Sequence, residues 1–291
     1  MRPAIWLWCA RVAWAVLPVT AGGALADALD SWGDGPARVA TACLWIAWSA
    51  GLLALFAPRP WGCTLLRVVA PLALVGALCS ISSTTAGSAA LAVASSFVAA
   101  ALALSAPVTD AAGNALAYGD EVRLPLRIPT ALLLVPVPIA IGLVGAGAVS
   151  GVLLLAAGSI AVGVVVTLVG VPIALVVARS LHTLSCRWLV LVPAGITVVD
   201  PLSLADPVLV RREEIASVRR VGATPSPPGV LDLRLGTVVG GVRFDLAAPV
   251  GFAPRRGRTG SELLEPDGVA VAVARPRTLL ALAQARRITT H

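Results

Sequence analysis

Lysine is absent from this chain of 291 residues, so all 22 of its basic residues are arginine. The absence excludes a P-loop, because that motif needs a lysine to bind the phosphates of a nucleotide. Histidine occurs only twice, at His182 and His291. Cys186 lies four residues after His182, but two ligands do not complete a metal site. We therefore expect no metal and no cofactor.

Reactive side chains are also scarce. The five cysteines include no C-x-x-C pair, and four of them lie in or beside apolar segments, where a thiol behaves as a small hydrophobic group. The serines and threonines between residues 80 and 96 have no histidine or carboxylate near them in the sequence to serve as a base. The sequence therefore does not predict an enzyme.

Charge is scarce as well, at 13% of residues against about 25% in soluble domains. Between Arg127 and Arg179 lie 51 consecutive residues with no Asp, Glu, Arg or His. As a helix this run would extend roughly 76 Å, whereas the hydrocarbon core of a bilayer is about 30 Å thick. We expect the run to cross a membrane twice and to turn back at 145–151, a stretch rich in Gly and Ala.

Six apolar segments predict an α-helical membrane bundle over residues 1–178. The expected transmembrane spans are 12–26, 39–57, 65–81, 88–106, 128–144 and 152–178. An alternative concerns the first of them, because Arg2 followed by apolar residues and Ala24-Leu25-Ala26 has the outline of a signal peptide. Arg11 interrupts its apolar region and argues against cleavage, which would leave five spans.

The connections between these spans alternate in arginine content. The basic ones carry Arg2 and Arg11, Arg59 and Arg67, Arg123 and Arg127, and finally the arginine-rich tail. Because Arg and Lys are retained on the cytoplasmic side of a plasma membrane, both termini are expected in the cytoplasm. The same rule explains the basic balance of the chain, so no nucleic-acid partner is expected.

Proline punctuates the predicted spans, most densely at Pro136-Val137-Pro138 inside the fifth. One interpretation is a discontinuous helix of the kind that transporters use to bind substrate. The other is a kink that neighbouring helices tolerate, since proline is common in membrane helices. Every Asp, Glu and Arg falls at or outside a predicted span end, which argues against ion-coupled transport.

The tail, residues 179–291, has short β-rich runs in place of long apolar ones. Residues 188–192 and 196–199 flank a Pro-Ala-Gly turn and predict a hairpin, and 230–235 with 238–246 predict another. Pro276 opens a helix that ends at Arg286-Arg287, where the helix dipole favours cations. We expect a small, mostly-β domain closed by one C-terminal helix.

A resemblance supports this expectation. The segments 187–196 (RWLVLVPAGI), 208–218 and 276–287 resemble the corresponding parts of bacterial pleckstrin-homology-like (PH-like) domains. The whole chain looks like actinobacterial multi-pass membrane proteins that carry such a tail. The resemblance implies a PH-like barrel and a binding or scaffolding role, but it brings no ligand motif to particular residues.

Four arginines are candidate contacts for lipid headgroups at the inner surface of the bilayer. Arg179 and Arg187 lie where the tail leaves the last span, and Arg211 and Arg212 lie beside an acidic pair. An arginine near an anionic leaflet contributes about 1 kcal/mol to membrane binding. Solvent exposure alone explains the outer two equally well.

Three functions remain open at this stage. The first is an integral membrane protein whose cytoplasmic domain binds a membrane or cytoplasmic protein or organises a complex. The second is a transporter or permease-like subunit for an uncharged or apolar solute, which needs a polar cavity at mid-depth. The third is a lipid-modifying enzyme, which would require five charged residues to converge: Asp110, Asp120, Glu121, Arg123 and Arg127.

Overall fold

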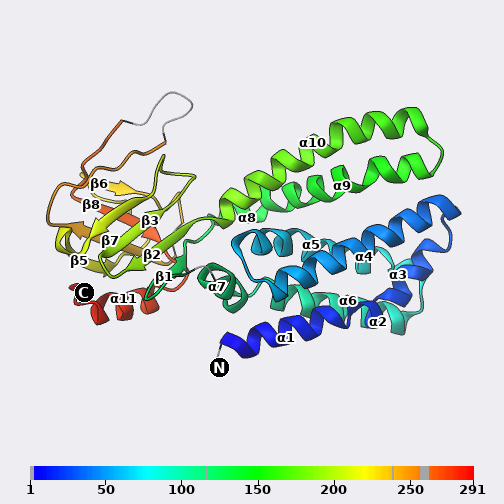
Figure 1. The fold of residues 1–291 in the computed structure, drawn as a ribbon, viewed down its shortest axis with the longest axis horizontal. Coiled ribbons are helices and arrows are strands. Elements are labelled where there is room, and N and C mark those ends of the chain that lie inside the picture. Colours follow the sequence, from blue (N-terminus) through cyan, green and yellow to red (C-terminus); the bar gives the residue numbers. More distant parts are fainter. Residues whose placement is uncertain (1–2, 116, 238, 256–261) are drawn as a thin grey trace. The chain divides into compact units, whose positions relative to one another are not determined.

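The computed structural model describes residues 3–115, 117–237, 239–255 and 262–291 (Figure 1). The chain forms two compact units. The helical unit comprises residues 1–115 and 137–182, and the β unit comprises residues 116–136 and 183–291. The chain therefore passes between the units three times, after residues 115, 136 and 182.

Five helices of the helical unit are long and apolar enough to cross a membrane. They are Asp34–Phe56 (α4), Pro60–Ser83 (α5 at Pro60–Cys79 with the 3-10 turn η1 at Ile81–Ser83), Ala86–Ala103 (α6), Pro136–Ala156 (α9) and Ile160–Ser185 (α10). A short helix, Ala106–Asn114 (α7), follows α6. The described residues thus contain a bundle of long apolar helices, as the sequence predicts, with five candidate spans in place of the six expected.

The N-terminal segment is helical but interrupted. It consists of Pro3–Ala15 (α1), Leu17–Thr20 (α2) and Gly22–Leu29 (α3), whereas the expected span was 12–26. Pro18 lacks a backbone N–H and sits at the start of α2, which explains the break after α1. All three pieces pack along α6 and run antiparallel to it. Ala10 and Trp14 belong to the same core cluster as Ala99 and Ala103, and Ala24 belongs to the same cluster as Ala92.

Trp14 joins α1 to α4 inside the bundle. Its indole N–H donates to the Trp48 carbonyl at 2.9 Å, and the Trp48 indole N–H donates to the Trp14 carbonyl at 3.0 Å. Gly51 makes room for this ring, since a Cβ there would lie 2.3 Å from it. In the sequence, Trp14 lies near the boundary of a predicted span, which suggests a residue at the membrane interface. In the structure Trp14 is only 1% exposed, whereas Trp8, Trp32 and Trp61 are exposed.

Arginines lie within several helices of the helical unit, including Arg38 in α4 and Arg179 in α10. Arg11 is in α1, where its Nε donates to the Leu55 carbonyl at 3.1 Å and its guanidinium lies 4.8 Å from the ring centroids of Trp8 and Phe56. Arg67 is inside α5, because this helix begins at Pro60 and not at residue 65. The helices thus extend beyond the predicted span ends, and the expectation that every charge falls at or beyond a span end stays a prediction.

The hairpin of α9 and α10 differs from the expected spans 128–144 and 152–178. Helix α9 continues through 145–151, and the chain reverses at 157–159, where Gly158 has a φ of +81°. Pro136 and Pro138 lie in the first turn of α9, where proline leaves no hydrogen bond unmade. The fifth helix therefore has no proline break at mid-length, and a separate short helix, Thr130–Leu134 (α8), precedes it.

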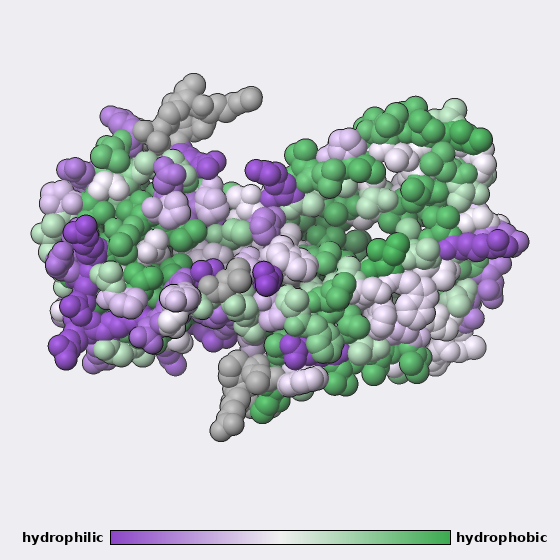
Figure 2. Space-filling view, in the orientation of Figure 1, coloured by the Kyte–Doolittle hydropathy of each residue, from purple (hydrophilic) through white to green (hydrophobic). Residues whose placement is uncertain are grey.

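The glycines expected to form that turn instead form a helix contact. A Cβ on Gly147 would lie 2.5 Å from the Gly170 carbonyl oxygen, and one on Gly151 would lie 2.1 Å from Thr167 Oγ1. Small residues four apart on α9 thus let the α10 backbone approach closely, as is common between membrane helices. The outer surfaces of both helices are hydrophobic (Figure 2).

The β unit contains two four-stranded sheets. The first has the order β1-β2-β3-β4 and is antiparallel throughout, with strands Val122–Pro125, Trp188–Val192, Gly195–Val199 and Val208–Arg211. The second has the order β5-β7-β8-β6, with β5 Ile215–Arg220, β6 Val230–Asp232, β7 Gly241–Leu246 and β8 Gly268–Ala272. A 3-10 turn, Arg212–Glu214 (η2), joins the sheets, and Pro276–Ala285 forms the C-terminal helix α11.

The predicted hairpin of residues 188–199 is confirmed as β2 and β3. The second predicted hairpin is wrong, because β6 does not pair with β7. Strand β6 pairs in parallel with β8, and β7 lies between β5 and β8. The short β6 ends at Asp232, whose carboxylate binds the Arg234 side chain.

Strand β1 comes from before the α9–α10 hairpin, so the β domain is not confined to residues 179–291. Its four residues pair with β2, and the following Leu126 bridges to Val273 just beyond β8. Leu124 and Leu126 are 4% and 5% exposed and belong to the main hydrophobic core of the unit, with Phe244, Phe252 and Leu279 among its members. β1 therefore joins the two sheets and completes the core.

Candidate functional site

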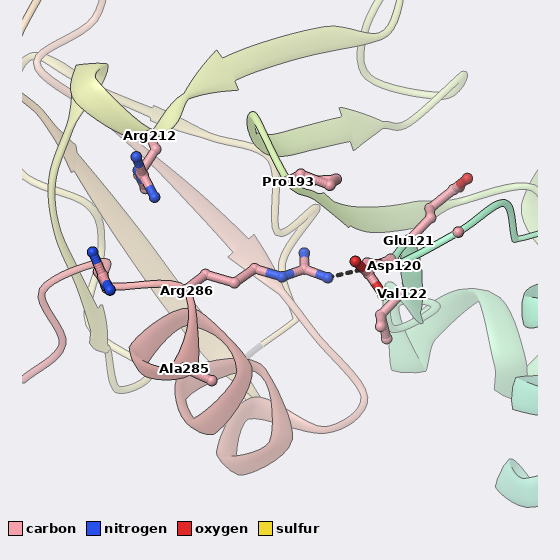
Figure 3. Close-up of a pocket in the computed structure, with 9 residues that line it drawn as sticks. Asp120, Glu121, Val122, Pro193, Arg212, Ala285 and Arg286 are labelled. Carbon is pink, nitrogen blue, oxygen red and sulfur yellow. Dashed lines mark hydrogen bonds between the residues drawn. The ribbon is translucent and has the colours of Figure 1, made fainter.

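An open pocket of about 610 Å³ lies on the β unit and is rich in arginine (Figure 3). It is formed by the segment before β1, the β2–β3 turn, the start of η2 and the end of α11. Its lining residues are Gly119, Asp120, Glu121, Val122, Pro193, Arg212, Ala285, Arg286 and Arg287. None of these side chains is a serine, cysteine or histidine, so the pocket holds ionic and apolar groups without an evident nucleophile.

Arg286 spans the pocket from the C-cap position of α11. Its side chain extends toward the segment before β1, where one terminal nitrogen donates to the Asp120 carbonyl (Figure 3). The other terminal nitrogen, Nη1, is buried and has no hydrogen-bond acceptor among the described residues. A buried donor on a cation without an acceptor is unfavourable, so this atom marks where an acceptor is missing.

Arg287 adopts an unusual backbone conformation beside it. Its φ is +60°, and the Arg287 and Ile288 amides donate back to the carbonyls of Gln284 and Ala283. This pattern is a Schellman helix end, whose left-handed position is usually glycine. A non-glycine residue at this position lowers the stability of the folded state by about 1–2 kcal/mol, so arginine is unfavourable here for the backbone.

Arg212 approaches the pocket from the other side. Its amide donates to the Ala194 carbonyl at 2.8 Å, which fixes η2 against the β2–β3 turn. Its exposed guanidinium points toward Arg286 and makes no hydrogen bond or ion pair with another described residue (Figure 3). The pocket therefore has one tethered and two unengaged guanidinium groups.

The two carboxylates of the pocket differ. Glu121 is bound by Arg123 at 2.6 Å and accepts from the Tyr118 amide. The hydrogen bond from Arg123 outweighs the effect of burial and holds the pKa of Glu121 below its ordinary value. Asp120 is exposed and its carboxylate does not neutralise Arg286, which contacts only the backbone of this residue. With Glu121 paired to Arg123, three arginines face one unpaired carboxylate.

The four arginines predicted as headgroup contacts have four different environments. Arg212 lines the pocket, and Arg211 beside it is exposed, with a Glu213 carboxylate 3.9 Å away. Arg179 is exposed near the end of α10 and belongs to the helical unit. Arg187 is buried, at 2% exposure, and cannot reach a lipid headgroup.

Arg187 instead organises the first sheet. Its Nε and Nη2 donate to the two carboxylate oxygens of Asp200 at 2.8 and 2.7 Å, and its Nη1 donates to the Arg127 carbonyl. Asp200 also accepts from the Ser203 hydroxyl and the Leu202 amide. The pair thus connects β2 to both the end of β1 and the chain after β3, and the candidate lipid contact is corrected to a structural ion pair.

A second, smaller hollow of about 200 Å³ lies elsewhere on the β unit. Its arginines include Arg219, Arg234 and Arg243. The Arg234 side chain is bound by Asp232, by the carbonyls of Gly222 and Thr224, and by the Ser226 hydroxyl. This pairing with Asp232 raises the pKa of Arg234. Because Arg219 and Arg243 both pair with Asp245, the arginines of this hollow are already engaged.

Burial opposes ionisation of Asp232, but the hydrogen bonds from the Arg234 side chain and amide and from Ser226 together keep the pKa of this carboxyl below its ordinary value. The ion pair thus holds the proline-containing loop 224–228 against the sheet. Its role is explained by folding alone.

The charged residues required by the lipid-enzyme hypothesis are divided between the two units. Asp110 belongs to the helical unit, and the other four belong to the β unit. Asp120 and Glu121 precede β1, whereas Arg127 follows it and lies against Gly240. His182 pairs with the Thr64 hydroxyl at 2.9 Å within the helical unit, and the described residues contain no cluster of three potential metal ligands.

Comparison of the chain with protein-family models, with curated proteins and with solved structures finds no match. The pocket therefore has to be interpreted from its own geometry. Sequence analysis places Arg286 and Arg287 at a helix end, but it does not bring them to Asp120 or Arg212, which are far away in the chain. A positive φ at arginine is the one local signal, and it is visible only in three dimensions.

Proposed function

We propose that this chain is an integral membrane protein whose β unit is a PH-like binding or scaffolding domain on the cytoplasmic face of the plasma membrane. The observation that carries the proposal is the pocket of Arg212, Arg286 and Arg287 on a domain otherwise closed around a hydrophobic core. Its residues supply charge and shape for recognition and no nucleophile with a base, which favours binding over catalysis.

The strand arrangement supports the PH-like interpretation. Four antiparallel strands in sequence order, three further antiparallel strands β5, β7 and β8, and a C-terminal helix correspond to the expected barrel. Two features depart from a simple version of it. Strand β6 adds a parallel edge to the second sheet, and the helices α8–α10 are inserted between β1 and β2.

The assignment of the β unit to the cytoplasmic side rests on the number of membrane crossings and on the distribution of arginine among the connecting loops. We take the segment α1–α3, which packs antiparallel along the candidate span α6, as a sixth crossing beside the five candidate spans. Six crossings place both ends of the chain on the same side. That side carries Arg59, Arg123 and Arg127, as the preference for arginine in cytoplasmic loops requires.

A transporter for an apolar solute is the alternative function. It requires a polar cavity at mid-depth in the helical unit. The buried residues described there are mostly alanine, leucine and valine with Trp14, besides Thr64, Ser80 and Ser96, and α9 lacks the proline break that first suggested this function. No observation on the described residues favours it over the binding role.

Photo-crosslinking in native membranes tests the proposed function. A photoreactive residue replaces Ala285, which lines the pocket, and a matched control replaces Ala281, which is exposed on the same helix outside the pocket. The proposal predicts a defined protein or lipid adduct at position 285 that is absent at position 281. Equal, nonspecific labelling at the two positions would contradict a binding role for this pocket.

A further inference from the structure

The geometry points to an organic phosphate monoester as the ligand of the Arg212–Arg286–Arg287 pocket. This inference rests on the proposed function and specifies its ligand chemistry. A phosphate monoester combines two negative charges, three acceptor oxygens and an organic substituent. Each of these properties has a counterpart in the pocket.

The first counterpart is charge. The guanidinium groups of Arg212, Arg286 and Arg287 are opposed by the carboxylate of Asp120, since Glu121 is already paired with Arg123. The remaining excess is two positive charges. A carboxylate ligand would neutralise one of them, whereas a phosphate monoester carries about −1.5 to −2 at pH 7 and neutralises both.

The second counterpart is an unfilled hydrogen bond. Arg286 Nη1 is buried without an acceptor, while its sister nitrogen is fixed by the Asp120 carbonyl. The guanidinium is thus oriented before a ligand arrives. Arg212 and Arg287 line the same pocket, and planar guanidinium forks bind phosphate oxygens in pairs.

The position of Arg287 excludes the simplest structural explanation. Cations at the end of α11 are favoured by the helix dipole, but that preference does not require arginine at a residue with φ of +60°. Arg286 already supplies a cation at this helix end. An arginine at a position that disfavours its backbone conformation is better explained by a contact that the guanidinium makes.

The third counterpart is apolar surface. Val122, Pro193 and Ala285 line the pocket beside the arginines, and its volume of about 610 Å³ exceeds what inorganic phosphate fills. This volume is typical of small-molecule sites, which combine apolar walls with a few polar groups. The organic part of the ester would lie against these walls.

The binding experiment uses the full chain in nanodiscs of phosphatidylcholine, with glycerol 3-phosphate as the titrant in calorimetry. The test variant is R212Q/R287Q. The control is R220Q/R277Q, which removes the same charge from exposed arginines outside the pocket. Because the test variant removes two guanidinium groups that can form charge-assisted hydrogen bonds, it should bind at least tenfold more weakly.

The control variant should bind as the unchanged chain does. Equal losses in both variants, or no binding of glycerol 3-phosphate at millimolar concentration, would overturn the inference. Acidification supplies a second readout, since the second pKa of the ester is about 6 and the arginines remain charged. Binding should therefore weaken from pH 7 to pH 5, and affinity unchanged over this interval would count against a dianionic ligand.

Two nanodisc compositions identify the source of the phosphate. If the ligand is a lipid, phosphatidic acid in the bilayer should compete with glycerol 3-phosphate, whereas phosphatidylglycerol, a phosphodiester, should compete less. If the ligand is soluble, neither lipid should compete. Either result supports a monoester site. Failure of monoester binding together with a specific adduct at position 285 would refute this inference and leave the proposed binding function intact.

Discussion

At the scale of single residues, the account depends on separating arginines that hold the fold from those that are free to bind. The two classes of arginine differ in their burial and in whether they have an ion-pair partner. Arg187 and Arg234 are buried and paired within the β unit, whereas Arg212 and Arg287 are exposed without an ion-pair partner among the described residues. Sequence alone does not distinguish these classes, because in a chain without lysine every basic position is arginine.

Replacing Arg287 by glycine should have opposite effects on stability and binding. Glycine accepts the positive φ, so R287G should raise the free energy of unfolding by about 1 kcal/mol. It should also weaken binding of glycerol 3-phosphate, because one guanidinium is lost. Urea-dependent proteolysis in detergent measures the first effect. A drop in stability would show that the Arg287 side chain is required by the fold.

The buried pair predicts a large loss on substitution. D200N leaves the Arg187 guanidinium buried with a neutral partner and should destabilise the β unit by about 3–5 kcal/mol. R211Q removes one member of an exposed pair and should change stability by less than about 0.5 kcal/mol. The same proteolysis assay compares the two variants, and similar losses would contradict the distinction between structural and surface arginines.

At the scale of elements, the sequence predicts which segments are apolar helices better than it predicts where they turn. The stretch 145–151 has the glycine content of a turn, but in α9 Gly147 and Gly151 face Gly170 and Thr167 of α10. Glycine serves both purposes, and only the partner helix decides between them. In the β unit, the local hairpin of β2 and β3 was predictable, whereas the pairing of β6 with β8 depends on contacts distant in sequence.

Alanine substitutions on α9 should distinguish a packing glycine from an exposed one. A Cβ at Gly151 would lie 2.1 Å from Thr167 Oγ1, so G151A should force α9 and α10 apart and destabilise the hairpin by about 1–3 kcal/mol. Gly142 has no neighbour within 4 Å, so G142A should be neutral or should stabilise the helix by about 0.5–1 kcal/mol. Thermal unfolding in detergent compares them, and the same sign of change in both would contradict the contact.

At the scale of the whole molecule, the division of the chain is the main result that the sequence did not predict. Composition changes sharply near Arg179, which suggested one membrane part followed by one domain. The four-residue strand β1 is too short and too far from the tail to be assigned to it by composition. Its membership follows from pairing with β2 and from Leu124 and Leu126 in the core.

This division predicts which fragment folds. Residues 183–291 alone lack β1 and leave the places of Leu124 and Leu126 empty, a loss of roughly 1.5–3 kcal/mol for each side chain. We expect that fragment to be unfolded or molten. A fusion of residues 117–129 through a flexible linker to 183–291 should give a folded domain with a rigid Trp188, detected by near-UV circular dichroism. A fully folded 183–291 fragment would contradict the role of β1.

The central claim is that the helical unit spans the membrane and the β unit lies on its cytoplasmic side. Protease treatment of intact spheroplasts tests it with one epitope placed after His291 and another in the turn at residues 82–85. The account predicts that the turn epitope is cleaved and the C-terminal epitope is protected until the membrane is permeabilised. Cleavage of the C-terminal epitope in sealed spheroplasts would contradict it.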